Sequence, residues 1–363
     1  MRRADRHVVQ KGRGAVGNPA GRFDATQLEP TDDGWGSLEE PAPNPATTLI
    51  AEFPKHAITR NRSPDVPFEQ SLNPYQGCEH GCIYCFARPA HAYLNLSPGL
   101  DFETRIFHKP QLASLLRREI SSPGYACKVL HVGGNTDPYQ PAERSLRSTR
   151  AVLELLLEHR HPLTLITKGA LILRDLDLLG ALAERRLVEV FVSLTSLDDA
   201  IKRTLEPRAA APRARLRVMR ELTAAGVPVG AMLAPVIPGL TDHEIERMLE
   251  AVADAGVRRA AYLMLRLPLE VAGLFEAWLR EHHPQRAERV LNRVREMHGG
   301  RLNDPRFGHR MRGQGAYAAL IDSRFAAACR RLGLNRGAAT GLDISQFIRD
   351  PGAPQQASLF DPA

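Results

Sequence analysis

Three of the five cysteines in this 363-residue chain lie within eight positions of one another, in the stretch GCEHGCIYCFARPAH (residues 77–91). Cys78, Cys82 and Cys85 have the spacing C-x₃-C-x₂-C. Thiolates this close in sequence can converge on one metal centre, because cysteine is a ligand of zinc and of iron–sulfur clusters. Cys127 and Cys329 are isolated, and we expect them to be buried thiols.

Three thiols leave a metal site one ligand short, and two kinds of site could fill that gap. A structural zinc site uses four ligands, and His80 or His91 could supply the fourth. An iron–sulfur cluster normally has four thiolates, so three would leave one iron open to a small molecule. The chain contains no second cysteine pair, which favours the cluster and keeps zinc as the alternative.

The cysteines need a scaffold, and short apolar strands alternate with helices from about residue 66 onward. The expected strands are 70–77, 128–134, 163–169, 188–196, 227–237 and 260–268. The expected helices between and around them are 110–120, 142–160, 174–185, 211–225 and 241–255. Strands that each feed a helix predict a parallel sheet, and nearly unbroken apolar runs indicate strands buried on both faces. Six units predict an α/β fold with a partial (β/α)₆ barrel, whose chemistry sits at the carboxyl ends of the strands.

Composition restricts the class of protein. The chain is 43% hydrophobic, enough for a full core, and it contains no apolar run of membrane-spanning length. The N-terminal stretch is basic without an apolar segment, so we expect no secretory signal, no membrane contact and a cytoplasmic location. A net charge of +7, mostly from arginine, is compatible with binding of phosphate groups and so of nucleic acid.

The cysteine spacing, with the aromatic Tyr84 before Cys85, resembles the C-x₃-C-x-Φ-C signature of radical S-adenosylmethionine enzymes. The resemblance implies a [4Fe-4S] cluster on Cys78, Cys82 and Cys85, whose open iron chelates S-adenosylmethionine. It also implies that one electron, supplied by an electron donor protein, cleaves this cofactor reductively, after which hydrogen is abstracted from a substrate. The partial barrel expected from the strand pattern is the core fold of that family.

This family resemblance gives an expected division of the chain. The four segments are an extended basic N-terminal segment (1–65), a radical SAM core (66–285), a C-terminal helical extension (286–349) and a flexible tail (350–363). Residues 270–300 and 316–335 are expected to be helical and to pack beside the barrel.

Segments after the later strands resemble the spore-photoproduct-lyase-like branch, also described as DNA repair photolyase-like. They are GGNTDPYQPAE, SLTSLD and EPRAAAPRARL, and RMRGQGAYAALI extends the likeness to a bacterial subgroup of that branch. The resemblance implies that the residues in contact with S-adenosylmethionine are Gly133, Gly134, Asn135, Lys168 and Ser193. An ordinary turn at 133–135 and a surface lysine at 168 are the alternatives. Glu206 or Arg208 is expected to line the mouth of the barrel.

One departure from the lyase concerns its hydrogen donor. The lyase carries a cysteine at the end of the second strand, where this chain has Gly133, Gly134 and Asn135. The hydrogen donor therefore remains unidentified, and thymine-dimer reversal through such a thiol is not expected.

The tail contains QASLF (Gln356–Phe360), which resembles the pentapeptide that docks bacterial proteins on the DNA polymerase sliding clamp. The alternative is a tail that packs Leu359 and Phe360 on its own core. The leading hypothesis is thus a radical SAM enzyme with an unknown substrate, for which nucleic acid is the first choice. The alternatives are a small-molecule or peptide substrate, or a metal-stabilised adaptor for the clamp that is not an enzyme.

Overall fold

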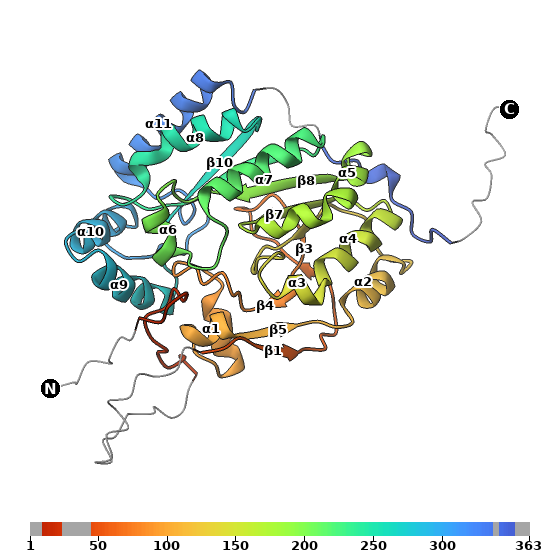
Figure 1. Cartoon of the computed structure of the whole chain (residues 1–363), viewed down its shortest axis with the longest axis horizontal. Coiled ribbons are helices and arrows are strands. Elements are labelled where there is room, and N and C mark those ends of the chain that lie inside the picture. Colours follow the sequence, from red (N-terminus) through yellow and green to blue (C-terminus); the bar gives the residue numbers. More distant parts are fainter. Residues whose placement is uncertain (1–8, 24–44, 337–340, 353–363) are drawn as a thin grey trace, which may run out of the picture.

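The computed structural model describes residues 9–23, 45–336 and 341–352 (Figure 1). The expected clamp-binding stretch Gln356–Phe360 lies outside the described residues, so docking on the clamp stays a prediction. In the described part of the chain, none of the helices combines the length and the apolar character that a bilayer crossing needs.

A seven-stranded sheet forms the centre of the molecule, in the order β10-β9-β8-β7-β6-β3-β2. Its strands are β2 (Thr59–Arg60), β3 (Gln70–Leu72), β6 (Leu130–Val132), β7 (Leu163–Thr167), β8 (Val188–Ser193), β9 (Val229–Val236) and β10 (Arg259–Met264). The six strands from β3 to β10 are parallel, and β2 pairs antiparallel with β3 at one edge. The expected parallel α/β sheet of six βα units is confirmed.

Helices follow the strands and cover the sheet because each presents one apolar face to it. They are α2 (Leu112–Ile120), α4 (Ser148–Glu158), α5 (Leu176–Glu184), α7 (Pro212–Ala224) and α8 (Ile245–Asp254). The expected helix over 142–160 is divided into α3 (Glu143–Leu146) and α4, since Arg147 adopts a left-handed φ of 52°. The helix α6 (Asp199–Leu205) was not predicted.

The N-terminal region contributes a second, smaller sheet that the sequence did not predict. Strand β1 (Thr48–Ala51) pairs parallel with β5 (Arg105–His108), which also pairs antiparallel with β4 (Tyr75–Gln76). The helix α1 (Leu100–Thr104) and the 3₁₀ turn η1 (Arg88–Leu94) flank this sheet. Residues 9–23 pack against the same region, where Ala15 and Val16 are fully buried.

Three helices extend the chain beyond the last strand: α9 (Glu270–His282), α10 (Ala287–Met297) and α11 (Gly315–Leu332). The expected helical region 270–300 is therefore two helices, and the one expected at 316–335 is α11. Figure 1 shows α11 alongside α8, and Arg324 of α11 forms an ion pair with Glu246 of α8. The boundaries proposed at residues 65, 285 and 349 stay predictions.

Candidate functional site

The three clustered cysteines lie on the loop between β4 and η1, which we call the cysteine loop (residues 77–87). Cys78 is buried, and Cys82 and Cys85 are partly buried; none of the three forms a disulfide. Burial raises the pKa of Cys78 well above its usual range, and the charges of Asp137 and of the other two cysteines raise it further. The cysteine loop therefore carries three metal-binding donors within eight positions of the chain.

One glycine and one buried ion pair give the cysteine loop its shape. Gly81 has a φ of +67°, and a Cβ there would lie 2.7 Å from Glu103 Oε2, so no larger residue fits. The carboxylate of Glu103 forms an ion pair with Arg88, and both side chains are fully buried. Arg88 also donates to the carbonyl of Cys82 at 2.9 Å and to that of Gly81 at 3.2 Å. Arg88 thus holds the backbone beside the thiols in place.

The loop that follows β6, the β6 loop (residues 133–142), holds the cysteine loop from a second side. The amide of Gln140 accepts from the backbone N–H of Glu79 at 2.9 Å and donates to the carbonyl of Gly77 at 3.2 Å. Asp137 lies 3.2 Å from His80 Nδ1 and accepts from the backbone N–H of Lys168 at 2.6 Å. Asp137 therefore links the cysteine loop to the carboxyl end of β7.

Asp137 was not singled out in the sequence. Burial alone would raise its pKa, but the charge of His80 and hydrogen bonds from His80, Lys168 and Thr167 lower the pKa to about 2. Asp137 is therefore ionised at neutral pH. From the loop after β6, it accepts hydrogen bonds at the end of β7 and faces His80 of the cysteine loop. Its place in the stretch GGNTDPYQ, directly after a buried strand, is the only sequence signal for it.

The structure brings the expected residues of the β6 loop to the sheet's carboxyl edge. Gly133 has a φ of +93°, and a Cβ there would lie 2.6 Å from Pro138 Cδ and 2.9 Å from the carbonyl oxygen of Ile166. Only glycine fits there. Gly134 follows, and the backbone N–H of Asn135 donates to Asn73 Oδ1 at 2.8 Å. The side chain of Asn135 is exposed.

Lys168, just after β7, lies beside the cysteine loop. Its ammonium is 5.7 Å from the centre of the Tyr84 ring. Burial, together with the charge of Glu206, raises the pKa of Cys82 to about 12, and the charge of Lys168 opposes that rise. Ser193, at the end of β8, is buried, and its carbonyl accepts from Arg215 at 3.1 Å. Both residues thus share one edge of the barrel with the cysteines.

Of the two residues expected as alternatives at the mouth of the barrel, Glu206 lies in the interior. Its side chain is buried, forms an ion pair with Arg215 and accepts from the hydroxyls of Tyr84 and Thr195. Burial would raise the pKa of Glu206, but Arg215 and Lys168 lower it to about 2. Arg208, the other candidate, is partly exposed and lies 3.1 Å from Glu79 of the cysteine loop.

The donor set suits an iron–sulfur cluster better than a single zinc ion. Among the described residues, no three His, Cys, Asp or Glu side chains are arranged to hold one ion. Of the two histidines considered as a fourth zinc ligand, His80 lies 3.2 Å from Asp137, and His91 Nε2 lies 3.1 Å from the carbonyl of Arg105. Among the described residues, the Nδ1 atom of each is buried without a hydrogen-bond partner. A cluster needs only thiolates from the protein, each bound to a different iron, and the cysteine loop carries three thiols.

Comparison with known proteins supports this interpretation of the site. The family described as the radical SAM superfamily matches residues 72–252. An uncharacterized protein of Mycobacterium tuberculosis (strain H37Rv) is 37% identical over 235 residues, which cover 64% of this chain and 68% of that protein. An uncharacterized protein of Methanocaldococcus jannaschii is 25% identical over 224 residues, 61% of this chain and 80% of the other.

Solved structures with the same fold include spore photoproduct lyase complexed with dinucleoside spore photoproduct. That structure matches with a TM-score of 0.55 at 13% identity, over 79% of this chain and 80% of the lyase. A variant of the lyase, also with dinucleoside spore photoproduct, matches with a TM-score of 0.56 over 82% of this chain and 87% of the other, at 13% identity. At this identity the likeness establishes a common fold.

Proposed function

Since this chain belongs to the radical SAM superfamily, we propose that Cys78, Cys82 and Cys85 hold a [4Fe-4S] cluster and that a nucleic acid is the substrate. The observation that carries the proposal is that one loop carries these three thiols and lies beside Lys168, with Asp137 linking that loop to the end of β7. The bound cluster would supply the electron that cleaves S-adenosylmethionine reductively, so that hydrogen can be abstracted from the substrate.

The chain's own residues then bind and orient S-adenosylmethionine. The ammonium of Lys168 is the cationic group beside Cys82 that can pair with the carboxylate of the cofactor. Gly133 and Gly134 let the backbone approach the cofactor closely, and Asn135 offers an amide oxygen to its amino group. The hydroxyl of Ser193 provides a further polar contact from the end of β8.

Two observations support nucleic acid as the substrate. The chain has a net charge of +7, which favours polyanionic partners. Its fold is shared with spore photoproduct lyase, whose structure contains a dinucleoside ligand. The β6 loop of this chain carries no cysteine at the donor position of the lyase, so we expect a reaction that ends differently from dimer reversal.

Lys168→Ala is expected to weaken S-adenosylmethionine binding roughly 10- to 100-fold, because a hydrogen bond to a charged group contributes about 1.5–3 kcal/mol. Equilibrium dialysis of anaerobically reconstituted protein measures the dissociation constant, and iron and sulfide content should equal that of the wild type. Lys128→Ala removes an exposed lysine that pairs with Glu69 and serves as the matched control. If Lys168→Ala loses iron as well, Lys168 supports the cysteine loop, and the assignment of Lys168 to the cofactor carboxylate is wrong.

The substrate class is tested by the rate at which dithionite-reduced protein converts S-adenosylmethionine to 5′-deoxyadenosine and methionine. The proposal expects slow conversion by the protein alone and faster conversion with DNA. Acceleration by peptides and not by DNA would favour the peptide alternative. A colourless protein that contains zinc in place of iron and cleaves nothing would favour the adaptor and contradict the proposal.

A further inference from the structure

Arg266, two residues beyond β10, is a half-buried arginine beside the cysteine loop. Within the described residues it forms no hydrogen bond or ion pair, although its Cζ lies 4.4 Å from the centre of the Phe86 ring. Phe86 directly follows Cys85, and its side chain is 42% exposed. Burial removes water from this guanidinium, and no hydrogen-bond acceptor among the described residues offsets the cost of that desolvation. An anion that binds to Arg266 would therefore be bound favourably.

The surroundings of Arg266 place it between the thiols and a second basic group. Burial lowers the pKa of Arg266 and the charge of Arg310 lowers it further, whereas the charges of Cys85 and Asp65 raise it. Asp65 is already occupied, because it accepts from the backbone N–H of Gly308 at 2.7 Å and forms an ion pair with Arg310. Arg266 therefore lies beside Phe86 of the cysteine loop without an ion-pair partner among the described residues.

Arg310 belongs to a segment that connects the two edges of the barrel. The backbone N–H of Met264, at the end of β10, donates to the carbonyl of Met311 at 2.9 Å. Arg310 then reaches the chain between β2 and β3, where it donates to Ser63 Oγ at 2.6 Å and pairs with Asp65. We call this connection between residues 61–68 and 301–314 the edge clasp; it holds Arg310 between the end of β10 and the chain that joins β2 to β3.

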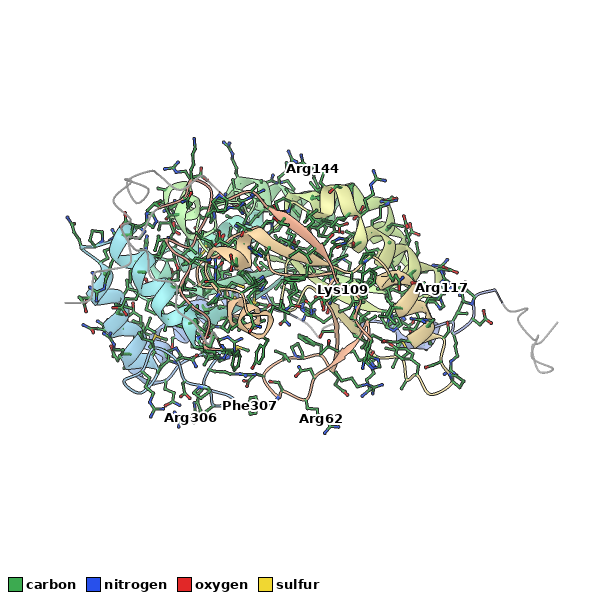
Figure 2. The ribbon with its side chains drawn as sticks, turned by 90° about the horizontal axis from the view of Figure 1, so that it is seen from below. Arg62, Lys109, Arg117, Arg144, Arg306 and Phe307 are labelled. Atoms are coloured by element: carbon green, nitrogen blue, oxygen red, sulfur yellow. The ribbon has the colours of Figure 1, made fainter. Side chains whose placement is uncertain are left out.

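The edge clasp carries a second pairing of arginine with an aromatic ring. Arg310 Cζ lies 4.7 Å from the centre of the Phe307 ring, and Phe307 is 57% exposed. Figure 2 shows Phe307 and Arg306 along one margin of the molecule with Arg62, whereas Arg144 lies at the opposite margin. Exposed aromatic rings next to arginine are typical of surfaces that stack bases and bind phosphates.

We propose that Phe86, Arg266, Phe307 and Arg310, the Arg–aromatic surface, bind a single-stranded segment of nucleic acid and direct it to the cysteine loop. Arg266 binds a phosphate oxygen pair through its planar fork, and Phe307 stacks a base. The inference rests on the proposed function for the identity of the substrate, but strand binding itself needs no cluster. A carboxylate ligand would satisfy Arg266 and leave the two exposed rings without a partner.

The test uses the full chain as purified, without cluster reconstitution, and fluorescein-labelled single-stranded DNA followed by anisotropy. Arg266→Gln is expected to weaken binding roughly 10-fold and to reduce the slope of log K against log salt by about 0.7, because one phosphate contact is lost. Phe307→Ala is expected to weaken binding about 5-fold or more through lost stacking. Arg117→Gln removes the same charge from α2, where Arg117 pairs with Glu158, and should leave binding unchanged.

Two further measurements separate this surface from its competitors. Arg266→Lys keeps the charge and loses the fork, and we expect affinity between that of the wild type and that of Arg266→Gln. On reconstituted protein, S-adenosylmethionine should bind Arg266→Gln as tightly as it binds the wild type. If cofactor binding falls while DNA binding is unchanged, Arg266 serves the cofactor carboxylate and the inference is wrong.

Equal DNA affinity of Arg266→Gln and Arg117→Gln would also overturn the inference. The inference would also be wrong if polyglutamate competed as effectively as unlabelled DNA and Phe307→Ala left the affinity unchanged. The surface would then bind any polyanion through charge alone. Failure of the wild type to cleave S-adenosylmethionine would contradict the proposed function without changing the outcome of these binding measurements. The two proposals can therefore fail separately.

Discussion

Cys82→Ala is expected to remove the iron and sulfide of the protein and to abolish S-adenosylmethionine cleavage. Wild-type protein purified without oxygen should be brown and contain about four iron and four sulfide per chain, as a cubane cluster requires. The cysteine loop supplies three thiols, so the variant retains only two protein ligands. The fold should persist, because Arg88 binds the backbone carbonyl of residue 82 and not its side chain. Iron and sulfide assays and the visible absorption spectrum measure the loss.

The matched control for this change is Cys127→Ala. Cys127 lies before β6, away from the cysteine loop in the sequence, and burial raises the pKa of its thiol to about 11. Cys329 is buried in α11, where the side chain of Asn335 lies 3.8 Å from its sulfur. The expectation of a buried thiol is confirmed for Cys329, whereas Cys127 is only partly buried. Cys127→Ala should keep a full complement of iron. Loss of the cluster in Cys127→Ala as well would contradict the assignment of the three ligands.

The central sheet could be predicted from sequence because its signals are local. The strands from β6 to β10 are short, mostly apolar runs, each followed by a helix. Buried and half-buried positions alternate along β7, β8 and β10, so the expected burial on both faces is incomplete. The small sheet could not be predicted in the same way. Strand β4 has two residues, and Thr48 of β1 pairs with Arg105 of β5, so the pairing depends on contacts between distant segments.

In the candidate site too, residues with local sequence signals could be predicted, and residues whose roles depend on distant contacts could not. The spacing of three cysteines and the position of Lys168 after a strand are visible in the sequence. The role of Asp137 is not visible in the sequence. A turn rich in Gly, Asn and Pro gives no reason to expect a carboxylate that links the cysteine loop to the end of β7. The interior position of Glu206 is not visible either, because only the fold reveals that Arg215 meets it there. The edge clasp joins Asp65 to Arg310 across 245 positions, which no local pattern predicts.

The buried carboxylate of Glu103 joins three parts of the chain that the sequence leaves separate. It accepts from the backbone N–H groups of Gly14 and Ala15, each at 2.9 Å, and forms its ion pair with Arg88 beneath the cysteine loop. Arg13 in turn donates to the backbone carbonyl of Glu103 at 2.9 Å. Residues 9–23 are therefore held by the same group that supports the backbone near the thiols.

Glu103→Ala is expected to lower the free energy of unfolding by about 3–5 kcal/mol, because it leaves the fully buried guanidinium of Arg88 without its partner. Urea unfolding followed by circular dichroism measures this loss. Trypsin should also cleave after Arg13 faster in the variant, because the N–H groups of Gly14 and Ala15 lose their acceptor. Glu158→Ala is the control: Glu158 pairs with Arg117 at the surface, with 44% of its side chain exposed, and should cost less than about 1 kcal/mol. Equal losses in the two variants, or unchanged cleavage at Arg13, would mean that packing of Ala15 and Val16 holds the N-terminal residues and that the ion pair does not.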